Sequence, residues 1–305
     1  MLMRNLKKFL MVNLIIFHAG SLSKPFEKLE QEFEKKYPGV DVKREASGSV
    51  TAARKITDLG RPCDVMASAD YTVIENLLIP KFADWNINFA TNEMAIMFTE
   101  DSKYSDVITE NNWYEILLKE DVSYGHSDPN ADPCGYRALL VWQLAEKFYG
   151  KEGLYNKLIA GCPLKNIRPK ETDLLALLEA GEIDYVFIYK SVAIQHNKKF
   201  LELPPMISLK NKDEEYFYKQ AEIQITGSKP GEMTTKNGEA MVYGITIPKN
   251  APNYNMALKF VEFVLSPIGQ KIMQDDGQEV IVPASSGQID KIPAELKGVV
   301  VSEKK

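Results

Sequence analysis

A strand, a Gly-Ser pair and a helix follow one another twice near the start of the chain, and this repeat limits the possible folds more than any other feature. An apolar run at 12–17 leads to a turn that contains Ser21, and an alternating segment at 40–47 leads to a turn that contains Ser49. Apolar residues at helical spacing follow each turn. Because strands that alternate with helices pair in parallel, both turns are predicted at the carboxyl edge of one sheet in an α/β protein.

The two serines allow two interpretations. A serine at a helix start commonly caps the helix by accepting a hydrogen bond from a backbone N–H group. Two such turns at one sheet edge also offer hydroxyl groups and free N–H groups beside the positive ends of two helix dipoles, and that arrangement binds anions. The sequence leaves both interpretations open for Ser21 and Ser49.

The segment GHSDPNADPCGYR at 125–137 places an acid where an anion would be expected. Its turn-forming residues predict a loop, which connects a strand-like stretch at 122–124 to a helical apolar pattern. Asp132 lies directly before Pro133, so it is a candidate helix N-cap worth about 1 kcal/mol. The same position also lies at the anion-binding end of a helix.

The stretch 167–196 contributes two further candidates. Pro169 marks a helix start, which places Glu171 in the first helical turn, and the apolar stretch 183–189 predicts a buried strand that ends at Tyr189. A glutamate in a first turn complements the helix dipole, and a tyrosine at a strand end is commonly a core residue. Either side chain can instead face a ligand at the sheet edge.

The order of the predicted elements divides the chain into two lobes. The strand 92–100 leads out of the first lobe. Segments 220–227 and 239–250 are predicted to form a hairpin, and the second of them returns the chain to the first lobe. The polar segment 286–305 is expected to wrap around the surface or to fray. The expected division is a discontinuous lobe I, 12–95 plus 241–305, and a lobe II, 96–240.

Composition excludes several classes of protein. The chain has 305 residues, of which 45% are hydrophobic and 26% charged, and its formal net charge is −5. It is therefore long enough for two lobes, and an acidic chain without clusters of Lys and Arg is not expected to bind nucleic acid. The 3 cysteines and 3 histidines are scattered, so neither a disulfide framework nor a resident metal ion is predicted.

The first residues look like the start of a secretory signal, because Arg4, Lys7 and Lys8 precede the apolar run 9–17. No small-residue cleavage site and no lipid-accepting cysteine follow. The same run also predicts a buried first strand at 12–17, which is the interpretation that we favour. If the protein is exported, its leader is then absent from this sequence or poorly preserved.

Several longer motifs carry a resemblance to a known family. Together with the sequence between them, from about residue 15 to about residue 285, they resemble the archaeal molybdate/tungstate-binding proteins of ABC importers. The resemblance implies the two-lobed type II periplasmic-binding-protein fold, with a mostly parallel sheet in each lobe and an oxyanion in the cleft between them. The motifs are FHAGSL at 17–22, SGSVTAARKITDLGRPCDVMASADY at 47–71, NNWYEIL at 111–117, SDPNADPCGYR at 127–137, GEIDYVFIYKSVAIQHN at 181–197 and VYGITIPKNA at 242–251.

The resemblance also implies roles for individual residues. Ser21 and Ser49 are expected to donate hydrogen bonds from the first lobe, and Tyr189 matches the cleft tyrosine of the family. Asp132 and Glu171 match two carboxylates that ligate the metal atom of the bound oxyanion and expand it toward six-coordination.

The segment before Glu171 departs from the family pattern, because it is shorter than expected and contains GCPLKNIRPK. The position of Glu171 therefore rests on its spacing to GEIDYVFIY, and Asp173 is the alternative for this carboxylate. The implied ligand is tungstate or molybdate, without a cofactor. The implied partner is the membrane permease of an ABC importer, and we expect a monomer outside the cytoplasm, at the cell surface or associated with the membrane.

Electrostatics discriminate among the possible anions. A carboxylate about 4 Å from a dianion is repelled by about 8 kcal/mol at an effective dielectric constant near 20. Two carboxylates would outweigh serine hydrogen bonds of about 1–3 kcal/mol each. Hexavalent tungsten or molybdenum takes oxygen ligands, so the carboxylates become attractive there. The alternatives are a receptor for sulfate or phosphate and an enzyme with a carboxylate acid–base pair. For the enzyme, the sequence offers no nucleophile–base pair, no phosphate loop and no candidate catalytic histidine.

Overall fold

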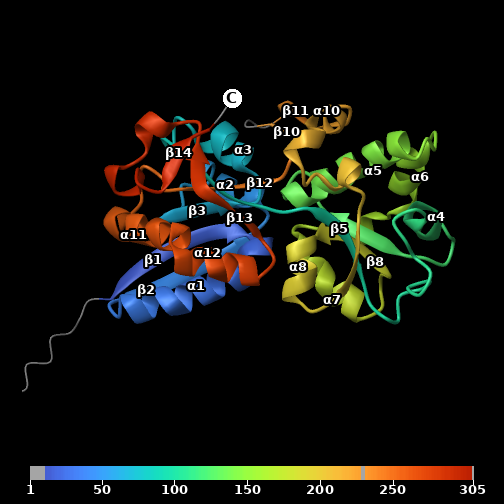
Figure 1. Cartoon of the computed structure of the whole chain (residues 1–305), viewed down its shortest axis with the longest axis horizontal. Helices are drawn as coiled ribbons and strands as arrows, with labels where there is room; N and C mark the ends of the chain where they lie inside the picture. Colours follow the sequence, from blue (N-terminus) through green and yellow to red (C-terminus); the bar gives the residue numbers. More distant parts are fainter. Residues whose placement is uncertain (1–10, 228–230, 304–305) are drawn as a thin grey trace, which may run out of the picture.

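The computed structural model describes residues 11–227 and 231–303, and these form two lobes that lie side by side (Figure 1). Each lobe contains one large sheet; we call the part around the seven-stranded sheet lobe I and the part around the five-stranded sheet lobe II. The predicted first strand is confirmed as β1 (Val12–Ala19). The basic residues of the possible signal fall within 1–10, outside the described residues.

Lobe I is centred on a sheet with the strand order β14-β13-β4-β12-β3-β1-β2. Its N-terminal strands pair in parallel around β1, as the alternating pattern predicts, whereas β12 pairs antiparallel with both neighbours. The strands are β1, β2 (Val40–Ser47), β3 (Val65–Ser68), β4 (Ile87–Thr91), β12 (Val242–Thr246), β13 (Glu279–Ser286) and β14 (Val300–Ser302). The helices are α1 (Ser23–Lys36), α2 (Ser49–Thr57), α3 (Tyr71–Val73), the π-helix η2 (Ile74–Leu78), α11 (Tyr254–Leu265) and α12 (Pro267–Asp275), with 3-10 turns η1 (Gly20–Leu22), η6 (Ile289–Lys291) and η7 (Ala294–Leu296).

Lobe II is centred on a sheet with the order β7-β6-β8-β5-β9, in which β6 pairs in parallel with β7 and β8 while β5 is antiparallel to its neighbours. Its strands are β5 (Met94–Phe98), β6 (Tyr124–Ser127), β7 (Ile167–Arg168), β8 (Tyr185–Tyr189) and β9 (Lys199–Glu202), and a separate hairpin contains β10 (Glu222–Thr226) and β11 (Met233–Asn237). The helices are α4 (Trp113–Leu117), α5 (Pro133–Phe148), α6 (Leu154–Gly161), α7 (Leu174–Glu179), α8 (Lys190–Gln195), α9 (Pro205–Ser208) and α10 (Glu215–Tyr218), with 3-10 turns η3 (Leu164–Asn166), η4 (Glu171–Asp173) and η5 (Lys212–Glu214).

Each lobe has its own aromatic packing. In lobe I, α1 packs against α11, where the ring of Phe33 contacts that of Phe260 edge-on with centroids 5.1 Å apart. In lobe II, the rings of Trp113 and Trp142 contact Phe187 of β8 edge-on. The helix α5 is buried along most of its length because it packs against β5, β6, β8 and β10. Both lobes are therefore firm supports for the turns at their sheet edges.

The register of the parallel strands brings the predicted turns together. In lobe I, Ala19 of β1 lies opposite Ser47 of β2, so the two Gly-Ser turns follow at the same edge of the sheet, as predicted. In lobe II, Tyr124 of β6 lies opposite Tyr185 of β8 in parallel pairing. The loop after β6 and the end of β8 consequently lie at one edge of the second sheet.

The predicted hairpin partner is wrong. Segment 220–227 does form β10, but β10 pairs with β11, which lies between the two segments that were predicted to pair. Four of the five residues of β11 are exposed, so its sequence carries no apolar alternation that indicates a strand. Segment 239–250 instead supplies β12, whose residues are all buried in the centre of the lobe I sheet.

The strands β4 and β14 are among the elements that were not predicted from the sequence. The strand β4 is the last strand of lobe I before the chain crosses at Asn92 and Glu93, and β5 already belongs to the sheet of lobe II. In the described part of the polar C-terminal segment, β14 pairs with β13 and extends the lobe I sheet.

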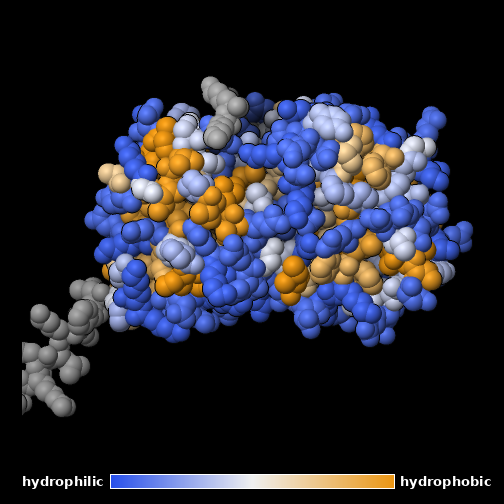
Figure 2. Space-filling view, viewed as in Figure 1, coloured by the Kyte–Doolittle hydropathy of each residue, from blue (hydrophilic) through white to orange (hydrophobic). Residues whose placement is uncertain are grey.

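In the described part of the chain, no helix is long and apolar enough to cross a membrane. Hydrophilic residues cover most of the face in Figure 2, and hydrophobic residues gather in groups over both lobes.

Candidate ligand site between the lobes

The five residues singled out from the sequence converge where the two lobes meet, and each is at most 1% exposed. The carboxylate of Glu171 lies against the backbone of lobe I: a methyl group built on Gly20 would be 2.9 Å from both carboxylate oxygens. The five residues are Ser21 and Ser49 from lobe I, and Asp132, Glu171 and Tyr189 from lobe II.

Asp132 uses both carboxylate oxygens in hydrogen bonds. As the N-cap of α5, it accepts a hydrogen bond from the backbone N–H of Cys134 at 3.3 Å. Its other oxygen accepts one from the backbone N–H of Glu171 at 2.9 Å, which joins the loop before α5 to the start of η4. Burial raises the pKa of Asp132, although the hydrogen bonds to its carboxylate act in the opposite direction. The predicted cap is present, and the same side chain also holds a second acid in place.

Glu171 is fully buried, and no hydrogen bond of ordinary geometry reaches its carboxylate oxygens among residues 11–227 and 231–303. The Asp132 carboxyl and the backbone N–H of Ser21 nevertheless lie close enough to influence its pKa. Burial, and then repulsion from the Asp132 carboxylate, holds the pKa of Glu171 well above its usual range. A buried carboxyl group without partners costs free energy that a purely structural residue would avoid. This acid is therefore a candidate for ligand binding.

Asp173, the alternative to Glu171, points to a different environment. It is partly exposed, and its carboxylate lies 3.5 Å from the ammonium group of Lys170. A surface ion pair of this kind contributes little to stability and offers nothing to the space between the lobes. The structure brings Glu171, and not Asp173, to the other four candidate residues.

Neither serine caps a helix. The N-cap of α2 is Gly48, and neither η1 nor α2 has a side-chain cap hydrogen bond. The hydroxyl of Ser21 instead lies 3.0 Å from the hydroxyl of Tyr243, and that of Ser49 accepts a hydrogen bond from the backbone N–H of Ala69 at 3.0 Å. Both hydroxyls therefore connect separate elements at the sheet edge, and the cap interpretation is wrong for both.

Tyr189 ends β8 beside a buried cation. Its hydroxyl accepts a hydrogen bond from the guanidinium of Arg137 at 3.0 Å, and Arg137 also donates to the backbone carbonyl of Ala69 at 2.7 Å. Burial raises the pKa of Tyr189 well above its ordinary value, and the charge of Arg137 opposes this shift. The phenol consequently keeps its hydrogen at neutral pH and can donate it.

The lobes are in direct contact around the site. The backbone N–H of Thr51 donates to the carbonyl of Ala131 at 3.2 Å, and a methyl group built on Gly48 would lie only 2.2 Å from the same oxygen. Asp70 of lobe I accepts hydrogen bonds from Lys236 at 2.7 Å and from Tyr136. The absence of a side chain at position 48 is therefore required for this approach of the two backbones.

Sequence reasoning missed three buried polar residues that border the site, namely Asn92, Arg137 and Tyr243. Arg137 and Tyr243 fall within motifs that were recognised, DPCGYR and VYGITIPKNA, but no role was assigned to them. The sequence signal that could have indicated a role for Arg137 and Tyr243 was a polar side chain within an otherwise apolar helix or strand. Such a residue needs a partner when it is buried, although the sequence does not say which one.

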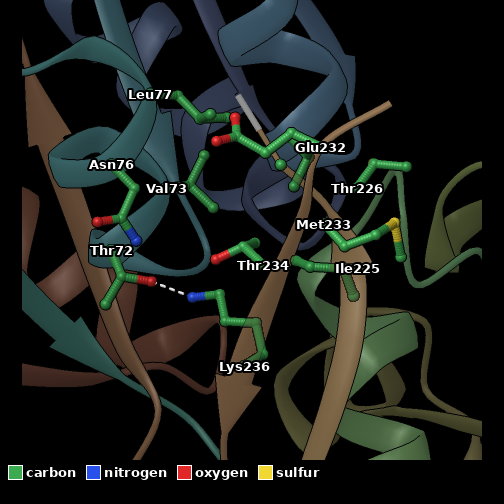
Figure 3. A pocket seen from close by; sticks show the side chains of 12 residues that line it. Thr72, Val73, Asn76, Leu77, Ile225, Thr226, Glu232, Met233, Thr234 and Lys236 are labelled. Atoms are coloured by element: carbon green, nitrogen blue, oxygen red, sulfur yellow. Dashed lines mark hydrogen bonds between the residues drawn. The ribbon is translucent and has the colours of Figure 1, made fainter. Parts of the chain in front are cut away.

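A separate cavity of about 240 Å³ lies between lobe I and the β10–β11 hairpin (Figure 3). Lys236 extends from the hairpin toward lobe I and donates a hydrogen bond to the hydroxyl of Thr72, drawn as a dashed line. None of the five candidate residues lines this cavity, so it is distinct from the site described above.

Comparison with known proteins identifies the family. The model of the bacterial extracellular solute-binding protein family matches residues 14–279. The chain belongs to this family. This solute-binding protein is 59% identical over 284 residues to an uncharacterized solute-binding protein of Petrotoga mobilis, covering 93% of this chain and 88% of the relative. As a member of the family, it is not an enzyme.

Two further relatives carry a more specific name. The chain is 47% identical over 313 residues to the molybdate/tungstate-binding protein WtpA of Pyrococcus abyssi, covering 94% of this chain and 89% of the relative. It is 44% identical over 315 residues to the protein of the same name from Thermococcus kodakarensis, covering 94% and 87%.

Solved structures confirm the predicted two-lobed fold. The periplasmic molybdate-binding protein of Azotobacter vinelandii matches with a TM-score of 0.64 at 19% identity, covering 87% of this chain and 98% of that one. The sulfate-binding protein SubI of Mycobacterium tuberculosis matches with a TM-score of 0.63 at 12% identity, covering 88% and 87%. At such identities the likeness concerns the fold alone.

Proposed function

We propose that this solute-binding protein holds tungstate or molybdate between its lobes, with Asp132 and Glu171 as ligands of the metal atom. In this proposal, Ser21, Ser49 and Tyr189 donate hydrogen bonds to the oxo groups. The observation that carries the proposal is the fully buried carboxylate of Glu171, which is repelled by Asp132 and for which the described residues provide no hydrogen bond of ordinary geometry. The two relatives named molybdate/tungstate-binding protein support the same class of ligand.

The chemistry of the two acids favours a metal oxyanion over other anions. At about 4 Å, an ionised carboxylate repels a dianion by about 8 kcal/mol when the effective dielectric constant is near 20. Sulfate offers a carboxylate no vacant coordination position. Hexavalent tungsten or molybdenum accepts further oxygen ligands, so the same carboxylates become favourable partners. Sulfate and phosphate remain the alternative ligands, since SubI shares the fold.

The position of the site between the lobes supports a role in delivering the anion to a membrane transporter. Because residues from both lobes would contact the anion, binding favours the closed arrangement over an open one. We propose that the closed protein docks on the membrane permease of an ABC importer, outside the cytoplasm, and that it acts as a monomer.

Competition among anions tests the proposal most directly. Native mass spectrometry of the protein with equal concentrations of tungstate, molybdate, sulfate and phosphate should show one bound tungstate or molybdate per chain. A complex with sulfate or phosphate alone would replace the proposal by its alternative. The expected small-angle scattering change is a more compact particle when the preferred anion is added.

X-ray absorption at the tungsten edge tests the role of the two acids separately. Six oxygen neighbours are expected, four from the original oxo groups and two from Asp132 and Glu171. A tetrahedral spectrum with four neighbours would leave the ligand in place but exclude the carboxylates as inner-sphere ligands.

A further inference from the structure

A chain of hydrogen bonds runs from the crossing between the lobes to Ser21. Asn92, which is 5% exposed, lies at this crossing. Its side-chain oxygen accepts hydrogen bonds from the backbone N–H groups of Glu93 at 2.9 Å and Ser191 at 3.4 Å. Since backbone N–H groups only donate, these contacts determine which end of the amide is the oxygen. The amide nitrogen of Asn92 must then be the atom 2.9 Å from the hydroxyl of Tyr243.

This orientation determines the direction of the next two hydrogen bonds. The amide nitrogen can only donate, so the hydroxyl oxygen of Tyr243 accepts from Asn92. Among the described residues, the remaining hydrogen-bond neighbour of the Tyr243 hydroxyl is the hydroxyl of Ser21 at 3.0 Å, so the hydrogen of Tyr243 is directed to that oxygen. Ser21 in turn accepts this hydrogen bond, and its own hydrogen is left for a further acceptor.

The other two candidate hydroxyls are oriented in the same way. Ser49 accepts from the backbone N–H of Ala69 at 3.0 Å, and Tyr189 accepts from the guanidinium of Arg137 at 3.0 Å. Neither a backbone N–H nor a guanidinium can reverse and become an acceptor. In the described residues, each of the three hydroxyls thus has a fixed donor behind it.

We propose that Asn92 is a positioning residue, which acts through Tyr243 to orient the hydroxyl of Ser21 as a hydrogen-bond donor to the bound anion. The inference rests on the proposed function of Ser21 as a ligand residue. Its consequence concerns specificity: three hydroxyls whose hydrogens are left free to donate favour an oxyanion whose oxygens are all acceptors. A hydroxyl free to rotate would accept or donate, and it would discriminate less.

The variant Asn92→Asp reverses the chain with little change in shape. A carboxylate at this position accepts from the hydroxyl of Tyr243, which must then accept from Ser21, so Ser21 loses the hydrogen that it would donate to the anion. Loss of one hydrogen bond to a charged ligand should weaken tungstate binding about 10- to 100-fold in isothermal titration calorimetry. The added negative charge also repels the anion, so it needs a control.

The control is the same substitution in a Tyr243→Phe background, where no hydroxyl connects position 92 to Ser21. The charge effect persists there, whereas the reversal cannot occur. The affinity loss caused by Asn92→Asp should therefore be about tenfold larger with Tyr243 than with Phe at position 243. Asn92→Ala provides a charge-free comparison, with an expected loss of about threefold with Tyr243 and none with Phe. If Asn92→Asp does not fold, as judged by circular dichroism, this second pair carries the test.

Equal losses in the two backgrounds would overturn the inference, and so would wild-type affinity in Asn92→Asp. Either result would leave the proposed function intact, provided that the wild-type protein binds tungstate or molybdate. If the wild-type protein binds neither anion, the proposed function fails and the inference fails with it. The wild-type titration and the comparison of backgrounds therefore report on the two claims separately.

Discussion

The two acids of the site occupy similar positions in the chain but have different surroundings. Asp132 and Glu171 both begin helical turns of lobe II, and both are buried. Both oxygens of Asp132 accept backbone hydrogen bonds, one of them from Glu171 itself. No hydrogen bond of ordinary geometry reaches either oxygen of Glu171 in the described residues. The hydrogen bonds of Asp132 therefore give it a structural role that is sufficient to explain its presence. Glu171 has no such structural role.

This difference distinguishes an acid that contributes to folding from one that is explained by ligand binding, although the two residues lie close together in the fold. An acid that caps a helix stabilises the protein whether or not a ligand is present. A buried acid without partners destabilises the ligand-free protein and is explained only by what binds to it. Substitutions at the two positions should therefore change ligand affinity in the same direction and stability in opposite directions.

The largest effect is expected at Glu171. Glu171→Gln removes a ligand of the metal atom, and tungstate affinity should fall about 100-fold or more by calorimetry. The same substitution removes a buried group that is repelled by Asp132, so the ligand-free protein should become more stable by about 1 kcal/mol, or about 2 °C in melting temperature. The matched control is Asp173→Asn on the same turn, which should leave both quantities unchanged. Unchanged affinity in Glu171→Gln would end the claim that this residue is a ligand.

Asp132→Ala should also weaken tungstate binding, by about tenfold or more, because it removes the second carboxylate. Its effect on stability should have the opposite sign. Loss of the N-cap of α5 costs about 1 kcal/mol, and the backbone N–H of Glu171 loses its acceptor as well. Urea denaturation of the ligand-free protein measures this change. An increase in stability here would contradict the comparison between the two acids.

Two glycines allow the acids to be disturbed from lobe I. A methyl group on Gly48 would lie 2.2 Å from the backbone oxygen of Ala131, beside Asp132, whereas one on Gly20 would meet the carboxylate of Glu171 at 2.9 Å. Backbone cannot move aside as a side chain can, so Gly48→Ala should weaken binding about tenfold and Gly20→Ala about threefold. Gly298→Ala, where a methyl group meets nothing within 4 Å, is the control.

Small-angle scattering distinguishes the two glycine variants further. Gly48→Ala should keep the particle extended in the presence of tungstate, because the contact between the lobes is blocked. Gly20→Ala should still become compact. If both variants close like the wild-type protein, the contact at Ala131 is not what limits closure.

The effect of pH on tungstate affinity is expected to be gradual. Burial raises the pKa of both acids in the ligand-free closed protein, so each binds a proton at a pH where an unfolded carboxyl group has lost it. Ligation requires the ionised form, so tungstate affinity should fall as the pH drops through these raised pKa values, by at most about tenfold per pH unit for each proton displaced. Calorimetry in buffers of different ionisation enthalpy counts the protons released. Glu171→Gln should release one proton fewer.

The same shifts determine how the stability of the ligand-free protein depends on pH. A carboxyl group with a raised pKa in the folded state stabilises that state at low pH, and the contribution disappears as the pH rises from the unfolded pKa to the folded one. The ligand-free protein should therefore lose stability over this range, and Glu171→Gln should lose less. Thermal unfolding at several pH values would show whether the two curves converge at low pH, as expected.

Much of the framework was determined locally by the sequence. The alternation of strands and helices predicted parallel pairing around β1 and the common edge for the turns at Ser21 and Ser49. Asp132 before Pro133 predicted an N-cap, and the apolar stretch before Tyr189 predicted β8. These features depend on neighbouring residues in the chain, through side-chain period and capping chemistry, which a sequence displays directly.

The errors arose where local pattern and tertiary environment disagree. The exposed residues of β11 carry no strand pattern, yet β11 pairs with β10, while the apolar stretch that was expected to pair with β10 became the central strand β12 of the other lobe. Both serines occupy positions suited to helix caps, but their hydroxyls bond to Tyr243 and Ala69. Strand partners and side-chain partners depend on burial, which single-sequence patterns describe poorly.

By itself, the sequence determined which residues would stand at the sheet edges, but the tertiary structure decided what each of them can do there. Ser21 and Tyr243 are separated by 222 positions, and Asn92 and Tyr243 by 151, so the direction of their hydrogen bonds is a property of the assembled fold. Within the described residues, the lack of well-formed hydrogen bonds to the Glu171 carboxylate likewise depends on every element packed around it. A hydrogen bond requires two groups within about 3 Å, and only folding brings groups this far apart in the chain to that distance.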